Sequence, residues 1–328
     1  MLVALTQDAD PKAVQQALMA RGLWIAATMR DLDGRHITYR IAPYSGQVDP
    51  NELRGIAGVA AVLLPAPEHP RMDRQGPQVD VGGVVIGGDQ PVFMCGPCSV
   101  ESEAQIDAIA ARVATHGVQF LRGGAFKPRS SPYSFQGHGD CALTWLRRAA
   151  DRNGLRVVTE VLSEQDVERV AEQTDLVQIG SRNMQNFALL KRVGQTGRPV
   201  LLKRSMSATV EEWLLAGEYL LLHGAAGVVL CERGIRSFDE HTRNLLDLGA
   251  VALLSQVHRL PVIVDPSHGT GRRDLILPLG RAALAAGAAG VMIETHDDPG
   301  KALSDGPQAL TGDELQRVLA ALQGKKAA

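Results

Sequence analysis

The first 64 residues alternate between short apolar runs and amphipathic stretches. One amphipathic stretch begins with Pro11 and ends with Gly22, as helices commonly do, and a second spans 49–56. Four strand-like apolar runs surround them, at 2–6, 23–29, 36–42 and 59–64. The order strand–helix–strand–strand–helix–strand is that of the split βαβ or ferredoxin-like motif. We therefore predict a small ferredoxin-like α+β domain at 1–64.

A polar segment separates this domain from the rest of the chain. Residues 65–78 are rich in proline and charge and poor in apolar side chains, which is typical of a linker between domains. The sequence VDVGGVVIGG at 79–88 then predicts a short hairpin. The second domain is expected to span 79–328.

Beyond residue 90, eight strand-like apolar runs alternate with amphipathic helical stretches. The runs lie at 92–99, 120–125, 156–161, 176–180, 199–204, 227–232, 261–267 and 290–296. Clear helical stretches span 103–117, 163–173 and 208–224. This alternation predicts an α/β fold, a (β/α)₈ TIM barrel, which typically has about 250 residues. A doubly wound open sheet is the alternative, but no GxGxxG sequence follows the first strand.

The composition is ordinary for a globular protein and narrows the range of partners. Of the 328 residues, 45% are hydrophobic and 21% are charged, and the formal net charge is −2. We expect neither nucleic acid nor an anionic membrane surface as a partner. The N-terminal residues lack the basic region of a secretory signal, and the apolar stretch 282–293 is too short to span a bilayer. We therefore expect a cytoplasmic protein, and its four cysteines are too few for a disulfide scaffold.

Catalytic groups of a TIM barrel lie at the C-terminal ends of its strands. Every predicted strand has an ionisable or metal-binding side chain there, and the loop after the last strand adds another. These residues are Cys98, Arg122 with Lys127, Glu160, Arg182, Lys203, Arg233, His268, Glu294 and Asp305. One such residue alone would more often be a salt bridge or a solvated loop charge. A complete set indicates a functional site.

Four of these residues are of metal-ligand type. They belong to the first, seventh and eighth strands and the following loop, and are Cys98, His268, Glu294 and Asp305. The last strand neighbours the first in a closed barrel, so the four side chains can converge. A thiolate, an imidazole and two carboxylates suit Mn²⁺, Fe²⁺, Co²⁺ or Zn²⁺ without selecting among them. The alternative is a buried cysteine near a capping histidine and two surface acids.

Most of the remaining residues are cations. They are Arg122, Lys127, Arg129, Arg182, Lys203 and Arg233. Such a group would repel itself unless anions occupy the barrel mouth, and these side chains bind phosphate and carboxylate oxygens well. We therefore expect one polyanionic substrate or two phosphorylated ones. Glu160, the lone acid among them, is expected to orient a lysine or a water, or to neutralise charge.

Two other chemistries remain open at this point. Lys203 could be the nucleophile of a Schiff-base aldolase, because neighbouring cations activate a lysine, but that enzyme has no use for the metal-ligand residues. Cys95 and Cys98 have the CxxC spacing of thioredoxin-like redox motifs, although no thioredoxin-like unit surrounds them. A disulfide between these two thiols would remove a metal ligand.

The segments that carry these residues resemble the signature segments of the 3-deoxy-arabino-heptulosonate 7-phosphate synthases, in the short subtype of the first class. They are GPCSVES (96–102), RGGAFKPRSSPYSFQG (122–137), TEV (159–161), QIGSRNMQN (178–186), LLKRSMSA (201–208), CERGIRSFDEHTRN (231–244), DPSHGTGRRD (265–274) and IETHDDPGKALSDGPQAL (293–310). The resemblance covers the whole predicted barrel. The domain at 1–64 also resembles the regulatory extension of some members.

This resemblance implies a reaction and a role for each residue. The family joins phosphoenolpyruvate to erythrose 4-phosphate with water and releases phosphate, the first step of the shikimate pathway to aromatic amino acids. The metal ligands would be Cys98, His268, Glu294 and Asp305. Phosphoenolpyruvate would be held by Arg122, Lys127, Arg182, Lys203 and Arg233, and the aldose phosphate by Arg129 and Ser130. Lys127 would donate a proton, and Glu160 would support the water network.

One sister family remains as an alternative. The 3-deoxy-manno-octulosonate 8-phosphate synthases share the barrel, but they have KANRSS where this chain has KPRSS at 127–131, and they lack an N-terminal extension. We therefore expect erythrose 4-phosphate rather than arabinose 5-phosphate as the aldose. We further expect feedback by an aromatic amino acid, Tyr or Phe, acting through residues 1–64, and a homo-oligomer, either a tetramer or a dimer.

Overall fold

The computed structural model describes residues 1–34, 36–129 and 131–324. The chain forms two compact units, Met1–Glu68 and His69–Ala328. The first holds a four-stranded antiparallel sheet and the second a closed eight-stranded parallel barrel, so the predicted fold class is confirmed. None of the described helices is long and apolar enough to cross a membrane.

The N-terminal unit has the predicted ferredoxin-like order. Its elements are β1 (Leu2–Leu5), α1 (Pro11–Met19), β2 (Ile25–Arg30), β3 (Ile37–Ile41), α2 (Pro50–Arg54) and β4 (Val59–Leu63), and its sheet order is β2-β3-β1-β4. Both helices begin at an Asp-Pro pair. The carboxylates of Asp10 and Asp49 accept hydrogen bonds from free backbone N–H groups of the first turn. One face of the sheet, with Val3, Leu5, Tyr39, Ile41 and Val62, packs against Val14 and Leu18 of α1.

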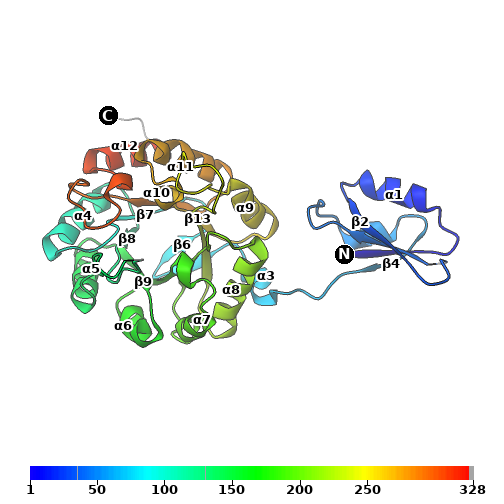
Figure 1. The fold of residues 1–328 in the computed structure, drawn as a ribbon, viewed down its shortest axis with the longest axis horizontal. Helices are drawn as coiled ribbons and strands as arrows, with labels where there is room; N and C mark the ends of the chain where they lie inside the picture. The colour runs from blue at the N-terminus through cyan, green and yellow to red at the C-terminus, as the bar shows by residue number, and fades with distance from the viewer. Residues whose placement is uncertain (35, 130, 325–328) are drawn as a thin grey trace. The chain divides into compact units, whose positions relative to one another are not determined.

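The barrel closes in chain order, with the last strand paired to the first (Figure 1). Its strands are β7 (Val92–Gly96), β8 (Phe120–Arg122), β9 (Arg156–Val161), β10 (Leu176–Ile179), β11 (Val200–Lys203), β12 (Val228–Glu232), β13 (Val262–Val264) and β14 (Gly290–Glu294). Because every pairing is parallel, all eight C-terminal ends meet at one rim, as predicted.

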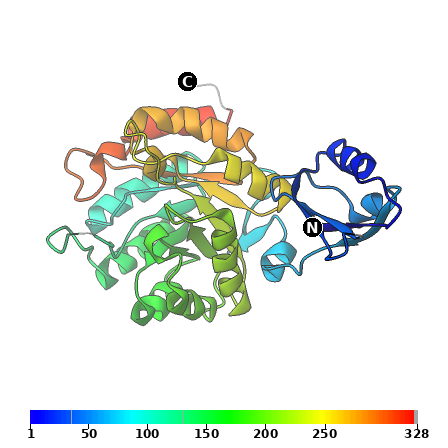
Figure 2. The ribbon, with the colours of Figure 1, turned by 45° about the vertical axis from the view of Figure 1, so that its right-hand side comes forward.

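Helices surround the barrel on its outside (Figure 1). They are α4 (Glu103–Thr115), α5 (Asp140–Arg152), α6 (Val167–Glu172), α7 (Phe187–Gly194), α8 (Val210–Leu222), α9 (Leu248–Ala252), α11 (Ile276–Ala285) and α12 (Gly312–Leu322). The short helix α10 (Pro266–Thr270) follows the C-terminal end of β13. Figure 2 shows α11 and α12, coloured orange to red, side by side. A capping box between Thr209 and Glu212 begins α8, close to the predicted start of that helical stretch.

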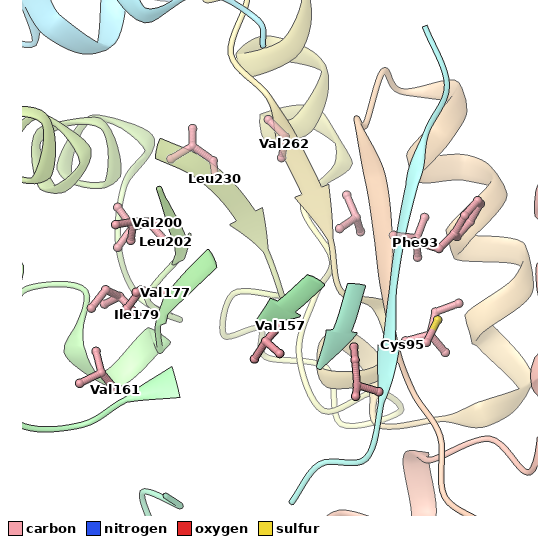
Figure 3. Close-up of a cluster of buried hydrophobic side chains, with 14 of the residues drawn as sticks. Phe93, Cys95, Val157, Val161, Val177, Ile179, Val200, Leu202, Leu230 and Val262 are labelled. Atoms are coloured by element: carbon pink, nitrogen blue, oxygen red, sulfur yellow. The ribbon is translucent and has the colours of Figure 1, made fainter. Parts of the chain in front are cut away.

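Strand alternation divides the core of the barrel into two layers. Val92 and Met94 of β7 belong to the inner cluster, whereas Phe93 and Cys95 belong to the outer cluster that packs against the helices. Figure 3 shows Phe93 and Cys95 on the same side of β7. The predicted hairpin, β5 (Val79–Val81) and β6 (Val84–Ile86), joins the inner cluster with residues that begin barrel strands. It therefore closes the N-terminal end and leaves the C-terminal end for chemistry.

The predicted linker at 65–78 is shorter in the structure, because part of it packs on the barrel. Residues 70–75 form the helix α3 (Pro70–Gln75), whose Met72 is fully buried. The carboxylate of Glu218 on α8 accepts hydrogen bonds from the backbone N–H groups of Arg71 and Met72, at 2.8 and 3.0 Å. The side chain of Gln75 exchanges two hydrogen bonds with the backbone of Val228. A single apolar residue among prolines and charges gave too weak a helical signal to be recognised.

Candidate active site

A cavity of about 480 Å³ opens at the C-terminal rim of the barrel. Its volume lies within the usual range for small-molecule sites, about 300–1,000 Å³. All six predicted cations line it, together with Glu160, His268 and Asp305. Cys98 and Glu294 are buried. Ser130, predicted to bind the aldose phosphate, lies outside the described residues.

The four predicted metal ligands converge. Ligand atoms of Cys98, His268, Glu294 and Asp305 all lie within 4.8 Å of one another. His268 Nε2 lies 3.2 Å from Glu294 Oε1, and the thiol of Cys98 donates to Asp305 Oδ2 at 3.4 Å. The group offers one thiol, one imidazole and two carboxylates, and the side chains of Cys98 and Glu294 are buried. This donor set fits a divalent transition-metal ion.

Neighbouring residues hold these candidate ligands in place. Asp265 Oδ2 lies 2.7 Å from Nδ1 of His268, the arrangement in which a carboxylate orients a metal-binding imidazole. Arg122 Nη1 donates to Glu294 Oε1 at 2.7 Å, and the amide of Gln308 donates to the other oxygen of Glu294. Our sequence reasoning did not identify Asp265 or Gln308. The Asp-Pro pair that begins α10 was the available signal for Asp265, which caps that helix.

The charges of this group are set by burial and by the partners. Burial alone would raise the pKa of Asp265, but His268 and Lys203 hold it well below its ordinary value. Burial acts likewise on Glu294, where His268 and Arg122 hold the pKa below the ordinary value. Burial, reinforced by Glu294, raises the pKa of the Cys98 thiol to about 11. Without a metal, the cluster therefore combines ionised acids with a protonated thiol.

Lys127 lies between the metal-ligand cluster and the cavity. Its Nζ donates to the carbonyl oxygen of Cys98 at 2.8 Å and contacts the Cys98 sulfur at 3.0 Å. It also lines the cavity. A proton on this ammonium group is thus next to both the candidate metal position and the space for a substrate.

Glu160 is held in a fixed place by the next strand. The amide of Gln178 on β10 donates to its Oε2 at 3.1 Å. Gly180 leaves the room that the carboxylate needs, since a Cβ there would lie 1.9 Å from Glu160 Oε1. Any side chain at Gly180 would therefore displace Glu160 from the cavity wall.

Two of the arginines that line the cavity have buried donors without a hydrogen-bond partner. Among the described residues, Arg122 Nε and Arg233 Nη1 are buried without a hydrogen-bond partner. Burial also lowers the pKa of Arg233. Leaving buried donors unpaired costs free energy, so an anionic ligand is the natural partner for both. Arg243, which we did not predict, also lines the cavity, with Nη2 3.7 Å from Asp305 Oδ1.

The fold and the site together define a TIM-barrel enzyme class, with a cationic small-molecule cavity beside a group of side chains suited to a divalent metal. The chain belongs to the DAHP synthetase I family, whose model matches residues 68–328. The family predicted from the signature segments is thus confirmed.

Known relatives agree with this assignment. A phospho-2-dehydro-3-deoxyheptonate aldolase of Thermotoga maritima is 52% identical over 232 residues, which cover 71% of this chain and 69% of that protein. A 2-dehydro-3-deoxyphosphooctonate aldolase of Geobacter sulfurreducens is 30% identical over 267 residues, 75% of this chain and 96% of that protein.

Solved structures show the same likeness. The structure of a phospho-2-dehydro-3-deoxyheptonate aldolase (DAHP synthase) from Thermotoga maritima matches 98% of this chain and 96% of its own, with 39% identity and a TM-score of 0.77. A truncated form of 3-deoxy-D-arabino-heptulosonate 7-phosphate synthase from Thermotoga maritima matches 76% of this chain and 92% of its own, with 44% identity and a TM-score of 0.71.

Proposed function

We propose that this protein condenses phosphoenolpyruvate with erythrose 4-phosphate and water to give 3-deoxy-D-arabino-heptulosonate 7-phosphate and phosphate, the first step of the shikimate pathway. The observation that carries this proposal is a cavity whose described lining residues include seven arginines and lysines and two acids, and which two of the four candidate metal ligands also line. Two anionic substrates and one Lewis acid account for both features. Family membership and the 52% identity to the heptonate aldolase support the choice of substrates.

The cations divide between the two substrates in this proposal. Phosphoenolpyruvate would pair with the buried donors of Arg122 and Arg233 and with Lys127, Arg182 and Lys203. Arg129, farther along the same loop as Lys127, would bind the phosphate of the aldose with Ser130. Guanidinium forks suit these phosphate and carboxylate oxygens. Because Arg122 also bonds Glu294, one side chain would link the phosphoenolpyruvate position to the metal position.

The reaction needs a polarised aldehyde, a positioned water and a proton. A divalent metal held by Cys98, His268, Glu294 and Asp305 would supply Lewis acidity and a template for the aldehyde or the water. Lys127 would donate the proton, since its ammonium lies at the boundary of the metal position and the cavity. Glu160, fixed by Gln178, would orient the water. Mn²⁺, Fe²⁺, Co²⁺ and Zn²⁺ all suit the donors.

One assay tests this function. Phosphate release from phosphoenolpyruvate is measured with erythrose 4-phosphate and with arabinose 5-phosphate, each with and without a chelator. We expect turnover with erythrose 4-phosphate that chelation abolishes and a divalent ion restores. Equal or faster turnover with arabinose 5-phosphate would assign the chain to the octulosonate chemistry instead.

The Schiff-base alternative is less well supported by the site. Lys203 Nζ donates to the buried carboxylate of Asp265 at 2.7 Å, an ion pair rather than a free amine. Borohydride reduction during turnover should therefore leave Lys203 unmodified. Covalent trapping of substrate on Lys203 would establish the aldolase mechanism.

The N-terminal unit is proposed to make the enzyme sensitive to an aromatic amino acid, Tyr or Phe. The N-terminal residues form a compact unit of their own, which supports this role. The match to the Thermotoga structure includes this unit, since it extends over 98% of this chain. An effector shifts activity only if it binds one arrangement better than another, typically by about 1–3 kcal/mol. We also propose a homo-oligomer, a dimer or tetramer, and a cytoplasmic location, where charged sugar phosphates are retained.

A further inference from the structure

The loop between β14 and α12 carries the candidate metal ligand Asp305 on a constrained backbone. Asp305 itself has a left-handed φ of 49°, which is unusual outside glycine. The next residue, Gly306, lies so close to the carbonyl oxygen of Pro299 that a Cβ there would be 2.1 Å from it. The position of the Asp305 carboxylate therefore depends on how the whole loop is held.

The side chain of Glu101 contacts this loop at two places. Its Oε1 accepts a hydrogen bond from the backbone N–H of Leu303 at 2.9 Å and another from the hydroxyl of Ser99 at 3.3 Å. Its Oε2 lies 3.4 Å from Nε2 of His296, at the start of the same loop. Beside it, the buried hydroxyls of Ser99 and Ser304 are 2.6 Å apart.

These contacts have a simple arrangement along the chain. The segment Cys98–Glu101 begins with one candidate ligand, Cys98. It ends with Glu101, which contacts the loop that carries another candidate ligand, Asp305. Leu303 and Ser304 immediately precede Asp305 in that loop. Glu101 does not line the cavity and does not belong to the metal-ligand group. Its carboxylate therefore contacts the loop and neither the substrate space nor the metal position.

We propose that Glu101 is a positioning residue that preorganises Asp305 for the metal. Without the contacts of Glu101, the loop must become ordered when the metal binds. The free energy of that ordering then weakens the metal affinity. The proposal rests on the metal site put forward above. Its test is therefore direct metal affinity, with activity as a second readout.

The experiment compares Glu101→Ala and Glu101→Gln with the parent enzyme. Affinity for Mn²⁺ and for Zn²⁺ is measured by competition with a chromophoric chelator. We expect Glu101→Ala to bind each ion about 10–100-fold more weakly, the usual range for lost outer-shell partners. Glu101→Gln keeps one oxygen for the Leu303 N–H and should fall between. At saturating metal, Glu101→Ala should regain most of the parent kcat, with little change in the KM for phosphoenolpyruvate.

A matched control separates positioning from general loss of stability. Thr209→Ala removes the capping box of α8, in which Thr209 and Glu212 hydrogen-bond to each other. It should lower the Tm of the apoprotein yet leave metal affinity within about twofold. If Glu101→Ala, or Glu101→Gln where the alanine variant does not fold, binds metal as tightly as the parent, Glu101 has no positioning role. Equal loss in Thr209→Ala would overturn it too. A parent that binds no metal would instead refute the metal site itself.

Discussion

The carboxylate oxygen Oδ2 of Asp265 lies 2.7 Å from Nδ1 of His268. The same oxygen accepts a hydrogen bond from Nζ of Lys203 at 2.7 Å, and Asp265 is fully buried. Asp265 thus joins a candidate metal ligand to a candidate ligand of phosphoenolpyruvate. His268 and Lys203 favour the ionised form of this carboxylate, so the pKa of Asp265 lies well below its ordinary value despite burial.

We expect Asp265→Asn to weaken both binding steps. The amide cannot form the ion pair with Lys203 and fixes the His268 imidazole less well, so metal affinity should fall about 10–100-fold. The KM for phosphoenolpyruvate should rise as well. Chelator competition and steady-state kinetics measure the two effects. Glu232→Gln, which weakens the buried ion pair with Arg204, is the matched control and should spare metal affinity. Unchanged metal affinity in Asp265→Asn would contradict the bridging role.

Metal affinity should increase with pH because of Cys98. Coordination requires the thiolate, and burial raises the pKa of this thiol to about 11 in the metal-free protein. Between pH 7 and 9 the free thiol is therefore protonated, and each metal ion bound releases that proton. Apparent affinity should rise by roughly tenfold per pH unit from this ligand. Cys98→Ser should flatten this slope by about one proton. A parent enzyme whose metal affinity does not change over this range would show that the thiol does not coordinate.

The stability of the barrel after removal of the N-terminal unit should depend on the residue at which the truncated chain begins. A chain beginning at His69 keeps α3, whereas one beginning at Val79 loses the buried Met72 and the pairing of Gln75 with Val228. We expect the shorter chain to be less stable by at least the cost of a buried Met→Ala change, about 2–5 kcal/mol. Denaturant unfolding measures this difference, with Met72→Ala in the full chain as the matched variant. Equal stability of both truncated chains would show that α3 does not support the barrel.

The truncated chain that begins at His69 also tests the regulatory proposal. The chain beginning at His69 should remain active and ignore Tyr and Phe, whereas the full chain should respond to one of them. Activity is measured across a concentration series of each amino acid. If the full chain is indifferent to Tyr and Phe, residues 1–64 do not have this role.

The sequence predicted the barrel well because each strand is a run of apolar residues followed by an ionisable or metal-binding one, a local pattern. Cys98, His268 and Glu294 could be placed by that pattern, since strand ends meet at one rim. Asp265 and Glu101 could not, because their roles depend on hydrogen bonds to residues far along the chain, such as Lys203 and Leu303. The helix α3 was missed for a related reason: Met72 is buried only because Gly217 on α8 leaves room for its side chain.

The CxxC spacing of Cys95 and Cys98 should have no redox consequence. Cys95 points from β7 into the outer core between the barrel and the helices (Figure 3), whereas Cys98 faces Lys127 and Asp305 at the rim. Both thiols are buried, and burial raises the pKa of each above its ordinary value, which leaves little reactive thiolate near neutral pH. Cys141 on α5 is the exposed thiol among the described residues.

We therefore expect a chromogenic disulfide reagent at neutral pH to modify one thiol of the native apoprotein quickly and the other three only as the protein unfolds. Cys141→Ser should abolish the fast phase, and Cys95→Ala should leave it unchanged. Cys95→Ala should also retain activity after mild oxidation and reduction to the same extent as the parent, because no bond forms between Cys95 and Cys98. Mass spectrometry of the oxidised apoprotein tests this directly. A disulfide-linked peptide containing both cysteines would show that the strand can open enough to join them, and the redox role would stand.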